Sequence, residues 1–306
     1  MSIRFFHIIL LIFLSLFFNG CFSEVESTPK ISYDSNSNLN SDTTKSLLSN
    51  ISNIPFKDWE YGKQFYVTDN KANLALYYKN DVNLLCGSSL TYIGYKEQTS
   101  IIGTTSTNIY FITEYNDTIS HTINSSHAQL CARNSIDVPF LVQKSLIDDI
   151  HNQLYNKQLF ILTNSWYSLD GKHFSGRKFD PISIIKVDIG NAIYPIKIIF
   201  NDKNDNSYFV YTTIGNEFQS ARNFEEIFSI SNPHEKYPYI NNETWGYIKN
   251  GLIKSGMTQE ECQLSIGLPS HVEIEETNSP NIIKKWVYNN GYILIFENSI
   301  LKDFKR

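Results

Sequence analysis

Beyond residue 60, the apolar residues of this chain come in short runs, and residues that favour turns separate them. Gln64–Val67, Leu90–Gly94 and Asn108–Thr113 are examples, each containing aromatic or β-branched side chains. Such side chains favour strands, whereas the Asn and Ser residues between the runs favour turns. Aromatic residues make up 14% of the whole chain. The sequence therefore predicts a β-rich α+β protein with many short strands.

The N-terminal segment has a different pattern. Phe5–Phe18 is an apolar run that follows the basic Arg4, and Gly20 stands directly before Cys21. The run is shorter than the roughly 20 residues that a spanning helix needs, and its length is typical of a signal-peptide core. The segment resembles the lipobox of bacterial lipoproteins, in which a peptidase cuts before a cysteine that carries the lipid.

This resemblance implies a signal peptide over 1–20 and a mature chain anchored through lipidation of Cys21. Two or more acyl chains give stable attachment to a membrane. We therefore expect a peripheral protein of the cell envelope, at the outer membrane, on its periplasmic or its surface side. An ordinary secreted protein and an uncut N-terminal anchor are the alternatives.

Composition divides the mature chain further. The segment 21–58 is rich in Ser and Asn, and its first part has few apolar residues, which predicts a flexible tether. We expect three folded parts after it, over 59–118, 119–236 and 237–306. The formal net charge of −5 shows no excess of basic residues that would attract nucleic acid, so we expect no nucleic-acid partner.

The part over 59–118 contains Tyr66-Val67-Thr68, then Ala72-Asn73-Leu74, then a run from Gly87 to Gly94 that includes Leu90 and Tyr92. This order resembles bacterial SH3-like modules, and the resemblance implies a small β-barrel. Ala75–Tyr78 stand where such modules have Arg-Ser-Gly-Pro. An unrelated small barrel or β-meander is the alternative.

The part over 119–236 is predicted to be mostly strands. Ile147, Ile150, His151 and Leu154 have helical spacing, which predicts one helix between Pro139 and Leu154. Ile196–Phe200 and Tyr208–Thr213 flank a polar turn and are predicted to pair as a hairpin.

The part over 237–306 carries the most specific pattern. Trp245 and Ile248 have helical spacing, and Thr258 with Glu261 forms a capping box that begins a second helix. Gly267 and Pro269 end that helix, and strands follow, two of them separated by the hairpin signal Asn290-Gly291.

The pattern of this last part resembles the small outer-membrane lipoproteins of the BamE (SmpA/OmlA) type. The matching residues are Gly256, Met257, Thr258, Glu261, Gly267, Pro269, Trp286, Tyr288 and Phe296. The resemblance implies two helices packed on an antiparallel sheet, and contact with envelope proteins or lipid. Cys262 and Asn298-Ser299 depart from the family pattern. Each matching residue has a structural role in the expected fold, so the motif identifies a scaffold and no reaction.

Patterns for chemistry are weak throughout the chain. We find no catalytic motif, so we expect no enzyme, no catalytic residues, no cofactor and no metal site. Cys131 with His121 and His127 lacks the sequence context of a cell-wall peptidase, and Asp202-x-Asn204-x-Asn206 reads as a polar turn more than as a calcium loop. Cys86 and Cys131 can bridge in an oxidising compartment, although small buried thiols are the simpler interpretation.

The expected function is a non-enzymatic lipoprotein that binds an envelope protein or acts as a scaffold, attached to the membrane through its lipid. A cell-wall or polysaccharide-acting enzyme is one alternative. A glycan-binding lipoprotein is another, with Trp59, Trp166 or Tyr167 as contact residues unless these rings pack in cores. Thr43 and Thr118 lie in triplets that resemble a bacterial O-glycosylation acceptor, and their modification stays open.

Overall fold

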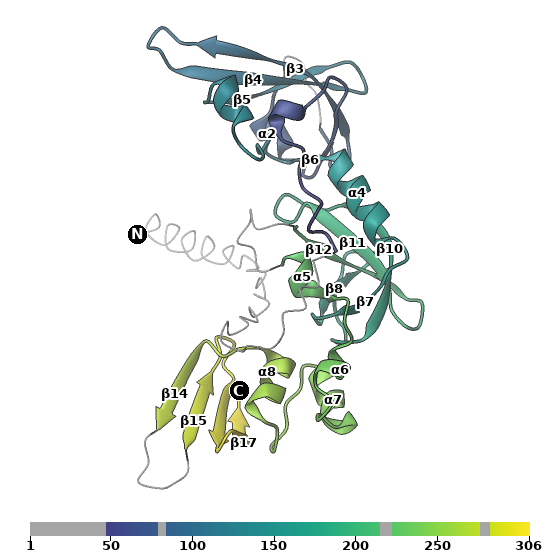
Figure 1. The fold of residues 1–306 in the computed structure, drawn as a ribbon, viewed down its shortest axis with the longest axis vertical. Helices are drawn as coiled ribbons and strands as arrows, with labels where there is room; N and C mark the ends of the chain where they lie inside the picture. Colours follow the sequence, from purple (N-terminus) through teal and green to yellow (C-terminus); the bar gives the residue numbers. More distant parts are fainter. Residues whose placement is uncertain (1–46, 79–83, 215–221, 276–281) are drawn as a thin grey trace, which may run out of the picture.

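The structure is a computed structural model, and it describes residues 47–78, 84–214, 222–275 and 282–306. Over these residues the chain forms three antiparallel sheets with short helices between them, which confirms the β-rich α+β class. Figure 1 shows the sheets following one another along the long axis of the molecule. The signal-peptide segment, Cys21 and Thr43 lie outside the described residues. No helix within the described residues has the length and apolarity needed to cross a membrane.

The first sheet has six strands. In sheet order its strands are β2 (Tyr77–Tyr78), β5 (Thr118–Ile123), β4 (Thr105–Thr113), β3 (Ser89–Thr99), β1 (Gln64–Val67) and β6 (Leu141–Gln143). A register shift between Tyr92 and Gly94 bends β3, where Gly94 has a φ of 122° that favours glycine. The sheet runs past residue 118, where we expected this part to end, because β5 pairs with β4 and β6 pairs with β1.

The core of the first sheet follows from strand alternation. On β4 every second side chain is buried, including Ile109 and Phe111. These two residues pack with Leu90 of the neighbouring strand β3 and Phe65 of β1. Short helices complete this part of the chain: η2 (Phe56–Asp58), α2 (Ala72–Ala75) and α3 (His127–Cys131).

Helix α4 (Lys144–Leu154) joins the first sheet to the second. It begins directly after β6, and Ile147, Ile150 and Leu154 of the predicted face are buried together with Leu146, whereas His151 is half-buried. This face packs on the middle sheet and shares its core. Val142 of β6 belongs to the same core, although β6 is hydrogen-bonded into the first sheet. The two sheets are therefore connected by packed structure.

The middle sheet has seven strands. In sheet order they are β13 (Phe228–Ser229), β7 (Gln158–Ile161), β10 (Pro181–Ile189), β11 (Ile196–Asn201), β12 (Ser207–Thr212), β8 (Ser165–Ser168) and β9 (His173–Ser175). The predicted hairpin is confirmed, since Ile196 pairs with Thr212 and Asn201 with Ser207. Helix α5 (Phe224–Ile227) precedes β13, and α6 (Pro233–Lys236) leads into the last part.

The last part is a layer of two helices on a four-stranded sheet, as the sequence predicted. Its elements are α7 (Asn242–Lys249), α8 (Gln259–Ile266), β14 (His271–Glu275), β15 (Ile283–Val287), β16 (Ile293–Glu297) and β17 (Ile300–Lys305). Both halves of the capping box form, with the Thr258 hydroxyl accepting from the Glu261 N–H and the Glu261 carboxylate accepting from the Thr258 N–H. Gly267 ends α8 with a φ of 86°. Trp245 and Cys262 from the helices meet Trp286 and Phe296 from the strands in one core.

Candidate functional site

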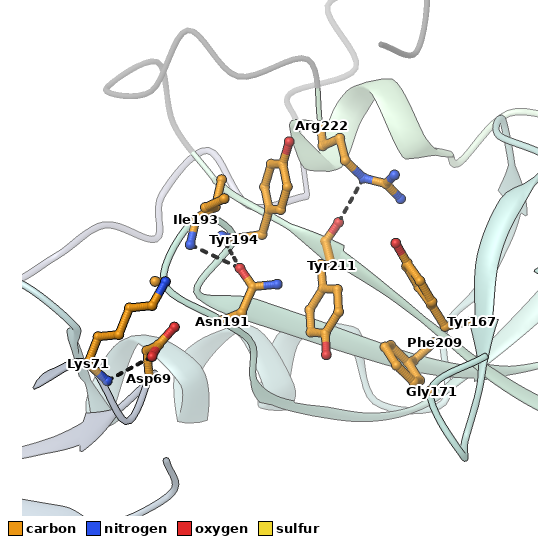
Figure 2. A pocket seen from close by; sticks show the side chains of 11 residues that line it. Asp69, Lys71, Tyr167, Gly171, Asn191, Ile193, Tyr194, Phe209, Tyr211 and Arg222 are labelled. Carbon is orange, nitrogen blue, oxygen red and sulfur yellow. Dashed lines mark hydrogen bonds between the residues drawn. The ribbon is translucent and has the colours of Figure 1, made fainter. Parts of the chain in front are cut away.

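A pocket of about 310 Å³ opens between the first part of the chain and the outer face of the middle sheet. Figure 2 shows Asp69 and Lys71 at one side of this pocket, Tyr167 and Phe209 at the other, and Tyr211 between them. Asp69 and Lys71 come from the segment between β1 and α2, and the three aromatic residues come from β8 and β12. Residues far apart in sequence therefore form one concave surface, which we take as the candidate ligand site.

The aromatic wall follows from alternation on β12. Val210 and Thr212 point into the molecule and are fully buried, so Phe209 and Tyr211 are on the opposite face. Tyr167 on β8 pairs with Phe209, and their rings stack with centroids 5.3 Å apart. The Tyr211 ring is 5.1 Å from the Phe209 ring. Phe209 is covered by these neighbours, whereas the rings of Tyr167 and Tyr211 are partly exposed to the pocket.

The turn between β10 and β11 forms a second wall with a fixed shape. The Asn191 side-chain oxygen accepts from the N–H groups of Ile193 and Tyr194, at 2.9 and 2.8 Å. Asn residues commonly stabilise turns in this way. At Gly190 a Cβ would lie 2.0 Å from the Tyr194 carbonyl oxygen, so the close approach of the backbone requires glycine. The turn thus holds Ile193 and Tyr194 at the pocket independently of any ligand.

Arg222 lines the pocket and holds the two strands that carry the aromatic wall. Its side chain is buried, and it donates to the carbonyl oxygens of Tyr211 and Ser165, at 3.3 and 3.4 Å. Its guanidinium carbon is 5.9 Å from the centroid of the Tyr194 ring. Arg222 therefore ties β8, β12 and the β10–β11 turn together and brings a positive charge to the pocket.

The surroundings of the Tyr211 hydroxyl favour its protonated form. Burial raises the pKa of Tyr211, and the neighbouring Tyr167 and Cys86 add to the rise. Burial also raises the pKa of the Cys86 thiol, Asp69 raises it further, and Lys197 opposes the shift. Both groups are neutral at pH 7, so the Tyr211 hydroxyl can donate a hydrogen bond to a polar ligand.

The rim on the side of the first sheet is held by local hydrogen bonds. The Asp69 carboxylate accepts from the Lys71 N–H at 2.8 Å, and the Asn70 side chain accepts from the Cys86 N–H at 2.7 Å. A second cavity, also of about 310 Å³, lies beside this pocket and shares Ala192 and Ile193 with it. The second cavity is lined largely by residues 136–143, together with Asn53, Trp59 and Thr68, so polar and apolar side chains line both cavities.

The three aromatic candidates from the sequence have different positions. Trp59 and Trp166 are 8% and 4% exposed and belong to the cores of the first and middle sheets. Both indoles pack in cores, the simpler of the two interpretations from the sequence, and neither lines the first pocket, although Trp59 also lines the second cavity. Tyr167 lines the pocket.

The matching residues of the C-terminal motif have structural positions. Thr258 and Glu261 cap α8, Met257 and Phe296 are buried, and Tyr288 donates from its hydroxyl to the Gly267 carbonyl at 2.9 Å. Trp286 is in the same core, Gly256 has a φ of 92°, and Pro269 follows the helix end. None of these residues lines the pocket.

The described cysteines are all free thiols. Cys86 is exposed and donates to the Thr68 carbonyl, Cys131 is partly buried, and Cys262 is buried. The bridge considered between Cys86 and Cys131 is therefore absent from the structure. The Cys131 sulfur lies 3.3 Å from Nε2 of His127 instead, and the His127 ring stacks on Tyr95 with centroids 4.1 Å apart.

The other described residues considered for metal binding, catalysis or modification do not line the pocket. His121 contacts the Ala75 carbonyl, and the Asp202 carboxylate accepts from the N–H groups of Asn204 and Asn206 and closes the β11–β12 turn. Over the described residues no group of three His, Cys, Asp or Glu side chains is placed to hold a metal ion. Thr118 is exposed at the start of β5.

Sequence reasoning did not identify Asn191, Tyr211 or Arg222 as site residues. The alternation of Phe209 and Tyr211 with Val210 was the available signal, because it places two aromatic rings on one face of a strand. It does not show whether that face is covered. A comparison of the sequence with models of protein families finds no match, and a comparison with curated proteins also finds none.

Proposed function

We propose that this chain is a non-enzymatic, lipid-anchored binding protein of the bacterial cell envelope, and that the pocket beside Tyr211 binds a glycan. The observation that supports this most is the combination of partly exposed Tyr167 and Tyr211 rings with Asn191, Asp69 and Arg222 in one preformed pocket. The lipid anchor at Cys21 and the envelope location remain proposals based on the N-terminal sequence.

A sugar ring matches this pocket chemically. One face of a pyranose presents C–H groups that pack on an aromatic ring, while its hydroxyls need donors and acceptors at the edge. The Tyr167 and Tyr211 rings supply the aromatic surface. The Asp69 carboxylate accepts hydrogen bonds, and the Tyr211 hydroxyl donates them. Rigid tyrosine side chains give such contact area at a low cost in conformational entropy.

The same lining favours binding over cleavage. Most glycoside hydrolases use two carboxyl groups that flank the scissile bond. Asp69 is the one carboxylate among the described residues that line the pocket. It is also already engaged by the Lys71 N–H. We therefore propose a ligand that is held unchanged.

A protein-binding role is the second candidate, and the C-terminal sheet is the observation that favours it. Strand β14 stands at the edge of this sheet, and its Val272 and Ile274 are 42% and 62% exposed. An edge strand with exposed apolar side chains can pair with an extended segment of another protein. The resemblance of this part to BamE-type lipoproteins points to the same class of partner.

The glycan proposal is tested by binding with the full-length protein in detergent. An array of bacterial surface polysaccharides and soluble peptidoglycan fragments identifies a ligand, and calorimetry measures its affinity. We expect Tyr211→Ala to weaken binding by about tenfold or more, which corresponds to ~1.4 kcal/mol of lost contact. Tyr211→Phe keeps the ring and should retain most of the affinity.

Tyr77→Ala serves as the matched control, because Tyr77 is an exposed tyrosine on β2 that does not line the pocket. Its affinity should equal that of the wild type. Binding of no glycan on the array, or equal loss in the Tyr77 and Tyr211 variants, would refute a glycan site at this pocket.

A further inference from the structure

The turn between β3 and β4 carries two adjacent apolar side chains that are almost completely exposed. Ile101 is 107% exposed and Ile102 is 86% exposed, so neither side chain packs on the protein. On β3 the five residues from Tyr95 to Thr99 are all exposed, whereas on the paired strand β4 Thr105 and Ser106 are half-buried and Thr107 is buried. Figure 1 shows the turn at the upper left end of the molecule, beyond the body of the first sheet.

The turn has a defined shape of its own. The Ser100 N–H donates to the Thr104 carbonyl at 2.8 Å, and the Gly103 N–H donates to the Ser100 carbonyl at 2.9 Å. The Ser100 hydroxyl accepts from the Thr104 N–H, and Gly103 takes a φ of 84°. Ile101 and Ile102 are the two central residues of this closed turn, so the backbone presents both side chains outward without needing a partner.

These two residues are unusual for their position. The central residues of turns are normally Gly, Pro, Asn, Asp or Ser, which are polar or conformationally suited to the turn. Isoleucine is β-branched and prefers a strand. Two adjacent exposed isoleucines leave apolar surface in contact with water, which is unfavourable. This indicates that another molecule with an apolar surface contacts them when the protein functions.

We propose that the Ile101-Ile102 tip inserts into the lipid bilayer to which the chain is anchored. This inference rests on the lipid anchor of the proposed function. The end of the hairpin suits a bilayer surface, since Gln98 and Ser106 pair across it, no charged residue lies between them, and hydroxyl side chains flank the two isoleucines; the exposed Lys96 and Glu97 follow on β3, where they would lie at the headgroup level. Charged side chains would oppose insertion, whereas Ser and Thr are compatible with the headgroup region.

The size of the apolar surface favours lipid over a protein partner. A standard protein interface takes ~800 Å² from each partner, which two side chains at a turn cannot supply alone. The strands below the tip add polar Thr, Ser and Gln side chains and then the charged Lys96 and Glu97, so they do not extend the apolar surface. Shallow burial of a few apolar side chains is instead sufficient to orient a protein that acyl chains already hold at the membrane.

The test places a reporter at the tip. The full-length lipoprotein Ile102→Trp is reconstituted into protein-free vesicles of phosphatidylethanolamine and phosphatidylglycerol, with or without brominated acyl chains that quench indole fluorescence. The four native tryptophans are at most 8% exposed, so they contribute a constant background. Tyr115→Trp is the matched control, because Tyr115 is 80% exposed in the turn at the opposite end of β4.

We expect brominated lipid to remove about half or more of the emission added by Ile102→Trp, consistent with insertion of roughly 5–10 Å. The emission added by Tyr115→Trp should be unaffected by brominated lipid. Equal and weak quenching of both variants overturns the proposal, and it is also the result expected if the tip binds a protein. Flotation and intact mass of the same samples separate this failure from failure of the anchor. Acylated protein that floats without quenching refutes the tip alone, whereas unacylated protein that does not float refutes both proposals.

Discussion

Cys262 stands where the BamE-type pattern usually has Val, and its thiol is completely buried between α8 and the C-terminal sheet. Burial raises the pKa of this thiol to about 12, and the adjacent Glu261 adds to the rise. Burial also raises the pKa of Tyr288, whose hydroxyl donates to the Gly267 carbonyl. Both groups are neutral in the folded state, so their burial carries no cost of removing a charge from water.

These raised pKa values predict a loss of stability at alkaline pH. Below pH 9 both the folded and unfolded states keep the Cys262 proton, so the thiol adds no pH dependence. Between about pH 9 and 12 the unfolded thiol ionises first, and the free energy of unfolding should fall by up to ~1.4 kcal/mol per pH unit. Urea unfolding of wild type and Cys262→Ala from pH 8 to 11 measures this slope. An identical slope in both proteins would show that Cys262 does not titrate in this window.

At the scale of elements, three local signals in the sequence predicted structure correctly. The capping box at Thr258, the helical spacing of α4 and the Asn290-Gly291 hairpin each depend on a few consecutive residues, and all three form. Helix α3 was not predicted, because its capping box of Ser126 and Gln129 precedes only one turn. The pairing of β6 with β1 was also missed, since it joins residues far apart in the chain.

Strand β9 depends on a close contact that local patterns do not show. The backbone of Gly176 lies directly against the buried Trp166 ring, and an added Cβ would come within 1.5 Å of the ring carbons. The Gly176 N–H also donates to the Asn164 carbonyl at 2.7 Å. The glycine is therefore required by packing, because it lets the chain cross the face of the indole.

Two glycine substitutions should consequently have opposite effects. Gly176→Ala should destabilise the protein by about 1–3 kcal/mol, because Trp166 or the backbone must shift. Gly246→Ala lies within α7 with nothing near its added Cβ, and it should stabilise by up to ~1 kcal/mol through helix propensity. Thermal unfolding of the two variants beside the wild type tests the pair. Equal small changes in the melting temperature would contradict the packing at Trp166.

At the scale of the whole molecule, the middle and C-terminal parts are joined by a short segment after β9. Phe179 adopts a left-handed φ of 60° and is buried in the C-terminal core, 5.8 Å from the Trp245 ring. The Lys178 ammonium donates to the Ser265 carbonyl, near the end of α8. Asp180 pairs with Lys249 of α7 at 2.8 Å, and both side chains are mostly buried. These contacts make the two parts one packed unit.

Removal of the Phe179 ring should weaken this connection. Phe179→Ala is expected to cost about 3–5 kcal/mol, because a buried ring is lost and a cavity remains. The effect should appear in calorimetry as separate unfolding of the middle and C-terminal parts. Phe304→Ala is the matched control, since Phe304 is 38% exposed on β17 and should change stability much less. A single transition with an unchanged midpoint in Phe179→Ala would refute the proposed coupling.

The candidate site also belongs to this scale, and it could not be predicted from the sequence. Its residues run from Asp69 to Arg222 and come from the first part, two turns and two strands of the middle sheet. Tyr167 was named as a candidate, but its position depends on β8 pairing with β12 across the sheet. The packing of α4, β6 and Leu48 on the middle sheet brings Asp69 toward Tyr211.

Both the membrane position of the pocket and the insertion of the Ile101-Ile102 tip require the proposed lipid anchor at Cys21. The direct test compares wild type with Cys21→Ala by cell fractionation and intact mass. We expect wild type in the membrane fraction, with its mass matching a chain that begins at an acylated Cys21, and the variant to be unacylated and lost from that fraction. If the two proteins fractionate alike and neither carries a lipid, the envelope anchor is wrong and the tip proposal is wrong with it.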